Sequence, residues 1–188
     1  MGKLTELLNN ARTRARELGL PYAGALTPKE AHEVWNLAPG AKLVDVRTRA
    51  EWDWVGRIPR AEEIEWMSYP TNQPNANFLA QLKHQVDPEA LVMFICRSGV
   101  RSHNAASLAT EAGYTESYNI LEGFEGERDA RGQRGRQHAV GFEHQHVARS
   151  GLEQLGGSVQ RHHAATFEHG DAPAQCLGLF QVMGGQQH

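Results

Sequence analysis

One short segment of the chain holds the residue types that nucleophilic chemistry requires. Cys96 directly follows the apolar run 91–95 and opens the segment Cys96-Arg97-Ser98-Gly99-Val100-Arg101-Ser102. Gly99 permits backbone angles that turn successive N–H groups toward one point, and the helix expected after the loop adds its positive end. Such surroundings favour the thiolate form of a cysteine, and two arginines add charges suited to an oxyanion. The pattern predicts a nucleophilic Cys96 in an anion-binding loop made of Arg97, Ser98, Gly99, Val100 and Arg101.

The alternative is that Cys96 is only a small apolar residue that ends a buried strand. The glycine and the two arginines at a strand-to-helix turn favour the reactive interpretation. The chain has two cysteines, Cys96 and Cys176, so a disulfide framework is excluded. A reactive thiol is kept available in a reducing compartment, which favours a cytoplasmic protein.

Strands and helices alternate along the chain around this segment. The sequence Thr27-Pro28-Lys29-Glu30 is a capping box, and Pro39-Gly40 ends the helix that it begins. Further helices are expected where apolar residues recur at helical spacing, near 78–86 and 105–112, and strands are expected at 43–46, 63–66, 91–95 and 118–121. Alternation of this kind predicts an α/β fold with a parallel sheet, whose ligand site lies beyond the carboxyl ends of the strands. Cys96 is at such an end.

Composition and charge argue against several other classes of protein. Apolar residues make up 40% and charged residues 22%, which is typical of a globular protein, and the formal charge is −3. This near-balance gives no reason to expect a nucleic-acid or membrane-surface partner. The longest apolar run, 91–95, is far too short to span a bilayer, and the N-terminus has no secretory signal pattern.

Three parts can be distinguished along the chain. Residues 1–19 have the apolar spacing of an amphipathic helix that ends at Gly19, and residues 20–135 form the domain proper. Residues 136–188 hold seven of the ten His and many Gln and Gly but no Trp, which predicts a poorly ordered tail. An added segment and a reading-frame change near residues 134–137 both explain the tail. Its histidines lack the compact spacing of a zinc site, so no metal is expected.

Three motifs in order resemble those of a single-domain rhodanese, a sulfurtransferase. They are LVDVRTRAEWDWVGRIPRAEEIEW (43–66), CRSGVRS (96–102) and YNILEGFEG (118–126). The resemblance covers roughly residues 20–130 and implies a five-stranded parallel sheet flanked by helices. It implies that Cys96 takes a sulfur from thiosulfate or a similar small anionic donor, forms a persulfide, and passes the sulfur to a thiol, cyanide or a protein acceptor. This chemistry needs no cofactor.

The resemblance also implies a supporting role for Asp45, Arg47 and Glu51, which we expect to form a structural ion-pair network rather than to act directly. Rhodaneses commonly have glycine where this chain has Arg60, so the turn at that position is expected to be strained or differently shaped. The residues Trp52, Trp54 and Trp66 are expected to pack in the core or at its rim. His103 is expected to be exposed in a first helical turn.

The sequence leaves two alternatives to a sulfurtransferase open, a cysteine phosphatase or arsenate reductase and a binding module. Dual-specificity phosphatases related to rhodaneses use a loop one residue longer, with the arginine six positions after the cysteine, whereas Arg101 is five positions after Cys96. The shorter loop favours sulfur over a phosphate or arsenate group. A non-catalytic, regulatory rhodanese-like binding module typically lacks the cysteine, so the presence of Cys96 argues against that function.

Overall fold

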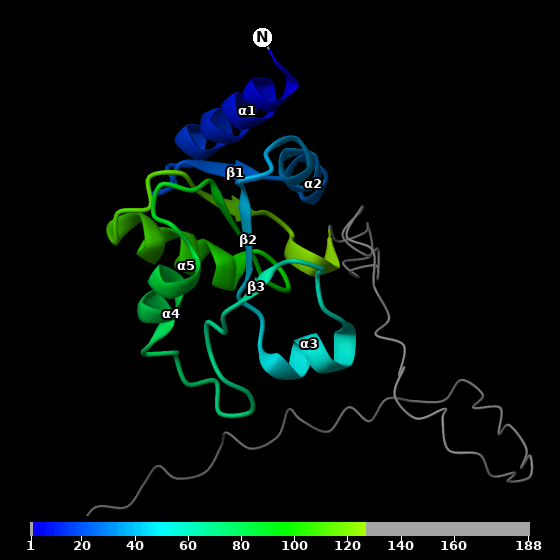
Figure 1. The fold of residues 1–188 in the computed structure, drawn as a ribbon, viewed down its shortest axis with the longest axis vertical. Coiled ribbons are helices and arrows are strands. Elements are labelled where there is room, and N and C mark those ends of the chain that lie inside the picture. The colour runs from blue at the N-terminus through cyan, green and yellow to red at the C-terminus, as the bar shows by residue number, and fades with distance from the viewer. Residues whose placement is uncertain (1, 127–188) are drawn as a thin grey trace, which may run out of the picture. The chain divides into compact units, whose positions relative to one another are not determined.

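Within the described part of the chain, five strands form a single parallel sheet with helices on both faces (Figure 1). The computed structural model describes residues 2–126, and the strand order is β1-β5-β4-β2-β3. The strands are β1 (Gly24–Leu26), β2 (Lys42–Asp45), β3 (Glu62–Glu63), β4 (Val92–Ile95) and β5 (Ser117–Ile120). The predicted α/β class and five-stranded parallel sheet are therefore confirmed.

Residues 2–126 also form five α-helices and one short 3-10 helix, of which α1 precedes the first strand and η1 follows the last. They are α1 (Lys3–Glu17), α2 (Pro28–Leu37), α3 (Arg49–Val55), α4 (Phe78–Gln85), α5 (Val100–Glu111) and η1 (Gly123–Glu125). Both α2 and α3 begin at capping boxes, in which a threonine side chain accepts from the backbone N–H three residues later and a glutamate returns the bond. The chain turns after α1 at Gly19, whose φ of +62° is in the left-handed region that glycine adopts easily.

The sheet is covered on both faces, which explains why β4 is apolar throughout. Met93 and Ile95 lie in the cluster that includes Ala11 of α1 and Val34 of α2. Phe94 and Cys96 lie in the other cluster, with apolar residues of α4 and α5. Because successive side chains of a strand point to opposite faces, a strand buried on both faces reads as a continuous apolar run.

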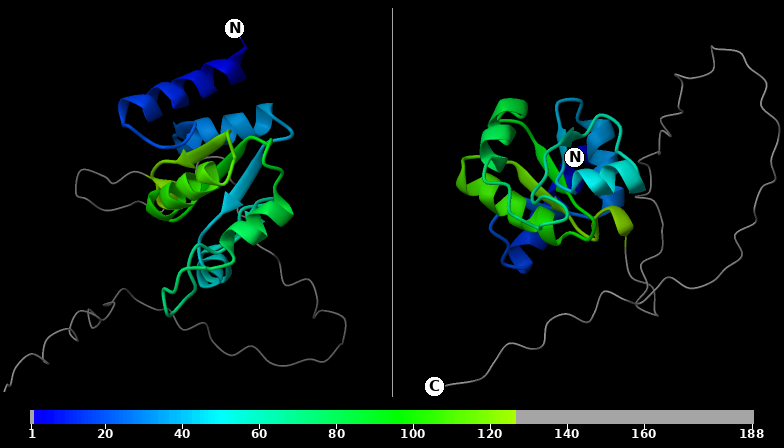
Figure 2. Two further views of the ribbon diagram at one scale, coloured as in Figure 1. Left: turned by 90° about the vertical axis from the view of Figure 1, so that its left-hand side faces the viewer. Right: turned by 90° about the horizontal axis from the view of Figure 1, so that it is seen from below.

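The carboxyl ends of β2 and β4 are adjacent, and this adjacency positions the site. Asp45, the last residue of β2, pairs in register with Ile95, the last residue of β4. The strand β2 points toward α3 (Figures 1 and 2), while α5 begins just beyond β4. Cys96 and the start of α3 therefore lie at the same edge of the sheet.

Some local features of the structure differ from those expected from the sequence. The strand expected at 63–66 is limited to Glu62–Glu63, although the N–H groups of Ile64 and Trp66 still donate to the carbonyls of β2 and the residue after it. The short elements β1 and α3 were not predicted at all. Arg60 has a φ of +63°, so the conformational irregularity expected where rhodaneses have glycine is present.

No helix among residues 2–126 is long and apolar enough to cross a membrane. The predictions for residues 136–188, including a poorly ordered tail without a metal site, lie outside the described residues. The boundary at residue 135 also lies outside them, so the three-part division of the chain stays a prediction.

Candidate active site

Two hydrogen-bond donors converge on the sulfur of Cys96. The backbone N–H of Gly99 donates to Sγ at 3.1 Å, and the hydroxyl of Ser102 donates to Sγ at 3.3 Å. Gly99 has a φ of +91° and is the N-cap of α5, so its left-handed backbone turns the N–H back toward the cysteine. The 12-residue helix α5 begins at Val100, and its positive end adds to these donors. Together they stabilise negative charge on the sulfur.

The structure places Val100 and Arg101 in the first turn of α5, so the irregular part of the expected six-residue loop ends at Gly99. Cys96 and Ser102 are fully buried, while Val100 is 66% exposed. The loop therefore places an apolar side chain on the surface next to the buried thiol.

A second segment fixes the loop from the other side. The N–H of Phe124 donates to the carbonyl of Cys96 at 2.8 Å, and the N–H of Glu125 donates to the carbonyl of Arg97 at 3.1 Å. Gly123 has a φ of +61°, and a Cβ placed there would approach the carbonyl oxygen of Cys96 and lie 2.7 Å from the nitrogen of Ser98. Only glycine fits between the two segments. The motif YNILEGFEG does not by itself indicate this supporting role, because the role depends on a contact with a distant segment.

Asn119 of β5 also holds the loop. Its side-chain amide donates to the carbonyl of Gly99 at 3.3 Å, and the residue is 2% exposed. The bond anchors the peptide that links the loop to α5. This role of Asn119 was not predicted, and the one signal available in the sequence is a polar residue between Tyr118 and Ile120 in a buried strand.

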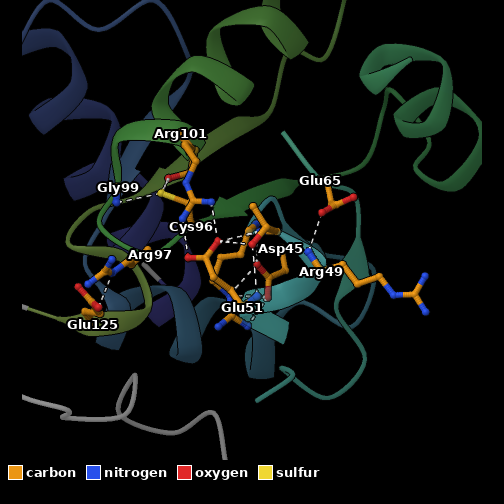
Figure 3. A network of polar contacts seen from close by, with 12 residues as sticks. Asp45, Arg49, Glu51, Glu65, Cys96, Arg97, Gly99, Arg101 and Glu125 are labelled. Carbon is orange, nitrogen blue, oxygen red and sulfur yellow. Dashed lines mark hydrogen bonds and ion pairs between the residues drawn. The ribbon is translucent and has the colours of Figure 1, made fainter. Parts of the chain in front are cut away.

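Both loop arginines are paired with carboxylates. Arg101 forms a bidentate contact with Glu51 of α3, in which both nitrogen–oxygen distances are 2.7 Å (Figure 3). Arg97 is 63% exposed, and its Nε lies 2.5 Å from the carboxylate of Glu125. Figure 3 shows the two pairs on either side of the Cys96 loop. The pairing of Arg97 with Glu125 was not predicted.

Asp45 and Arg47 form a buried ion pair at the wall of the site. The side chains of both are 1% exposed, and two guanidinium nitrogens of Arg47 contact the carboxylate of Asp45, the shortest contact measuring 2.7 Å. Arg47 also donates to the carbonyl of Gly56 at 2.8 Å and lies 4.0 Å from the ring centre of Phe124. The pair thus links the end of β2 to the segment that supports the cysteine loop, while Glu51 binds Arg101 instead.

The carboxylate of Glu51 is strongly perturbed. Burial raises its pKa, but the hydrogen bonds and charge of Arg101, together with the N–H and hydroxyl of Thr48, outweigh burial and lower the pKa from 4.5 to about 2. Glu51 therefore joins α3 to the first turn of α5 as a carboxylate over the whole neutral range.

Acid stability should depend on this residue. A carboxyl group whose pKa is lower in the folded state than in the unfolded state stabilises the fold. This contribution is complete above the pKa of the unfolded state, and it is lost as the pH falls through the pKa of the folded state. For Glu51 that window runs from about pH 4.5 down to about pH 2. We expect Glu51→Gln to lower the free energy of unfolding at pH 7 by roughly 2–3 kcal/mol, and the difference from wild type to shrink below pH 4.5.

Urea denaturation at a series of pH values measures this dependence. The control is Glu33→Gln, because Glu33 pairs with Lys3 at the surface, where such ion pairs contribute little. A difference between wild type and Glu51→Gln that stays constant from pH 7 to pH 2 would contradict the assigned linkage.

Other expected features have mixed outcomes. His103 was expected to be exposed, but it is half-buried, because its Nδ1 lies 2.8 Å from the hydroxyl of the buried Tyr22. Trp52 packs in the interior as predicted. Trp54 is 75% exposed and meets Tyr69 edge to face, so it belongs to neither core nor rim.

A polar groove of about 460 Å³ lies between the start of α3 and α4. Its charged lining residues are Arg49, Glu63 and Glu65, and amide side chains of Asn75 and Gln81 complete much of the wall. The backbone N–H of Arg49 donates to Glu65, as Figure 3 shows. The groove was not predicted, since its residues come from segments without regular pattern.

Comparisons with known proteins agree with this geometry. Residues 30–129 match the family model of the rhodanese-like domain. An uncharacterized protein (RC0915) of Rickettsia conorii is 40% identical over 95 residues, which are 49% of this chain and 76% of that protein. A thiosulfate sulfurtransferase (GlpE) of Actinobacillus pleuropneumoniae serotype 3 is 32% identical over 97 residues, or 50% of this chain and 80% of that one.

Among solved structures, the crystal structure of Rv0390 from M. tuberculosis is similar. It is 45% identical, the match covers 64% of this chain and 96% of that chain, and the TM-score is 0.56. The residues that match the family model, 30–129, include the strand and loop that carry Cys96.

Proposed function

This chain belongs to the rhodanese-like domain family, and from that premise we propose that it is a sulfurtransferase that carries sulfane sulfur as a persulfide on Cys96. The donor is thiosulfate or a similar small sulfur compound. The acceptor is a thiol, cyanide or a protein thiol. The convergence of the Gly99 N–H and the Ser102 hydroxyl on the Cys96 sulfur is the observation that carries the proposal.

The proposed reaction has two halves. In the first, the Cys96 thiolate attacks the outer sulfur of thiosulfate, the sulfur–sulfur bond breaks, and sulfite leaves with the bonding electron pair. In the second, the acceptor attacks the outer sulfur of the persulfide and the Cys96 thiolate is regenerated. The N–H of Gly99 and the positive end of α5 stabilise the negative charge that each half leaves at the cysteine.

The surrounding residues fit positioning roles in this scheme. Gly123 and Asn119 fix the loop so that the N–H of Gly99 stays aimed at the sulfur. The ion pairs of Arg101 with Glu51 and of Arg47 with Asp45 hold the wall of the site. Fixed donors of this kind need no reorganisation during the reaction, which is how preorganised sites lower a barrier. Because the chemistry requires a free thiol, we also propose a reducing, cytoplasmic setting.

Phosphate-ester hydrolysis is the enzymatic alternative, and two features weigh against it. Arg101 follows Cys96 by five positions, and its guanidinium is engaged by Glu51 in a bidentate contact. A phosphate-binding arginine must offer the same planar fork to the substrate. The pair with Glu51 therefore favours a sulfur donor over a phosphate ester.

Parallel assays of the full chain test the assignment. We expect turnover with thiosulfate plus cyanide, and no turnover above background with a generic aryl phosphate. The fraction of Cys96 alkylated at increasing pH tests the binding-module alternative, because an inert thiol would behave like free cysteine, whose pKa is about 8.5. Hydrolysis of the aryl phosphate without sulfur transfer would reject the proposal.

A further inference from the structure

A chain of polar contacts leads from His103 to the loop that holds Cys96. Nδ1 of His103 lies 2.8 Å from the hydroxyl of Tyr22, and the two rings meet edge to face with their centroids 5.3 Å apart. The backbone N–H of His103 and the side-chain amide of Asn119 both donate to the carbonyl of Gly99, at 3.1 and 3.3 Å. The N–H of Gly99 in turn donates to the sulfur of Cys96. Residues from three segments of the chain are thus linked to Gly99.

The hydroxyl of Tyr22 is enclosed in the core. Tyr22 is 5% exposed and belongs to the same apolar cluster as Cys96. Burial raises the pKa of Tyr22, and a hydrogen bond with the side chain of Asn119 opposes this rise. A contact that lowers a tyrosine pKa stabilises the phenolate, so the amide presents its N–H to the tyrosine oxygen. The hydroxyl hydrogen is then left for Nδ1 of His103, which accepts it when the ring proton is on Nε2.

The side-chain amide of Asn119 has few restraints on its orientation. Its nitrogen donates to the carbonyl of Gly99, but its oxygen is buried and has no hydrogen-bond partner within residues 2–126. If the amide turned over, its oxygen would accept from the hydroxyl of Tyr22, and the bond to Gly99 would be lost. A buried hydroxyl without an acceptor costs at least as much free energy as one hydrogen bond contributes. The acceptor that His103 offers to Tyr22 therefore decides between the two orientations.

We propose that His103 is a positioning residue that acts on Cys96 through Tyr22. With the tyrosine hydroxyl engaged by His103, the amide of Asn119 keeps its N–H on the carbonyl of Gly99. The N–H of Gly99 then stays aimed at the sulfur. The inference rests on the proposed sulfurtransferase function and adds to it a residue outside the cysteine loop.

His103→Phe removes the acceptor alone, because a phenylalanine ring keeps the edge-to-face contact with Tyr22 and keeps water out of the space. The buried hydroxyl must then turn to the oxygen of Asn119. We expect kcat/KM with thiosulfate plus cyanide to fall about tenfold, less than on removal of an oxyanion donor, because the N–H of Gly99 is displaced rather than lost. His103→Asn keeps an acceptor near the position of Nδ1 and should stay within about threefold of wild type.

The double variant of Tyr22→Phe and His103→Phe distinguishes this role from a merely structural one. Without the tyrosine hydroxyl nothing draws the oxygen of Asn119 away, so the second substitution should restore kcat/KM to within about threefold of wild type. Tyr22→Phe alone should also remain within that range. Tyr114→Phe is the matched control, because it removes a buried hydroxyl that donates to the carbonyl of Val86 at 3.0 Å. It should leave kcat/KM unchanged.

The rate of alkylation of Cys96 by iodoacetamide, followed by peptide mapping, is a second measurement that does not require sulfur transfer. It should fall in His103→Phe and recover in the double variant, because the N–H of Gly99 stabilises the thiolate. If His103→Phe leaves either rate unchanged, or if the double variant stays as slow as His103→Phe, the inference is overturned while the sulfurtransferase function remains intact. If wild type transfers no sulfur but alkylation follows the expected order, the proposed function fails and the positioning role of His103 stands.

Discussion

Replacing Cys96 by serine is expected to abolish sulfur transfer and to leave the fold intact. The two side chains are almost the same size, and the hydroxyl can still accept hydrogen bonds from Gly99 and Ser102. A serine hydroxyl cannot form a persulfide, so the loss should reach the detection limit, at least about 1,000-fold in kcat. Steady-state assays with thiosulfate plus cyanide measure the loss of sulfur transfer. Circular dichroism and thermal unfolding show whether the fold is intact.

The control for this substitution is Cys176→Ser. Cys176 is the second cysteine of the chain, and it has no role in the proposed reaction. This variant should retain full activity. Substantial turnover by Cys96→Ser, or loss of turnover in Cys176→Ser, would show that the nucleophile is assigned to the wrong residue.

The second large effect is expected at Gly123, a residue that does not touch the sulfur. A Cβ there would collide with the carbonyl of Cys96 and lie 2.7 Å from the backbone of Arg97 and Ser98. Gly123→Ala must push the cysteine loop away, which misaims the N–H of Gly99. We expect a loss of at least about 100-fold in kcat/KM, because small misplacements of catalytic groups have effects of this order. The free energy of unfolding should fall by about 2–4 kcal/mol, from backbone strain and overpacking together.

Gly19→Ala separates backbone strain from displacement of the loop. Gly19 has a φ of +62°, nearly that of Gly123 at +61°, but a Cβ there would meet nothing within 4 Å. This variant should therefore show the effect of backbone strain alone. Its free energy of unfolding should fall by about 1 kcal/mol, and its kcat/KM should be unchanged. Equal kinetic effects in the two variants would contradict the supporting role of Gly123.

The parts of the site that could be predicted from sequence are those encoded locally. The apolar run before Cys96 indicates a strand buried on both faces, and Gly99 marks the turn into α5, so the cysteine was correctly placed at the end of β4. The first capping box, at Thr27, indicates a helix clearly because a regular apolar repeat follows it. The equivalent box at Thr48 begins a helix of only seven residues, too short for a clear apolar repeat, and α3 was missed.

The parts that could not be predicted depend on contacts between distant residues. Arg101 and Glu51 are 50 positions apart, and Arg97 and Glu125 are 28 apart. The sequence identifies the arginines as possible anion ligands, but it does not indicate which carboxylates neutralise them. The fit of Gly123 against the cysteine loop is of the same kind, since it arises only when the segment after β5 lies beside the end of β4.

The mass of the intact protein after treatment with a sulfur donor shows directly whether Cys96 takes up a sulfur atom. The full chain would be incubated with thiosulfate or 2-hydroxyethyl persulfide, freed of excess donor, and compared with Cys96→Ser treated in the same way. We expect a gain of one sulfur atom per chain in wild type, located on Cys96 by peptide mapping, lost on addition of cyanide and absent from Cys96→Ser. No gain with either donor, or an equal gain in Cys96→Ser, would contradict this role of Cys96.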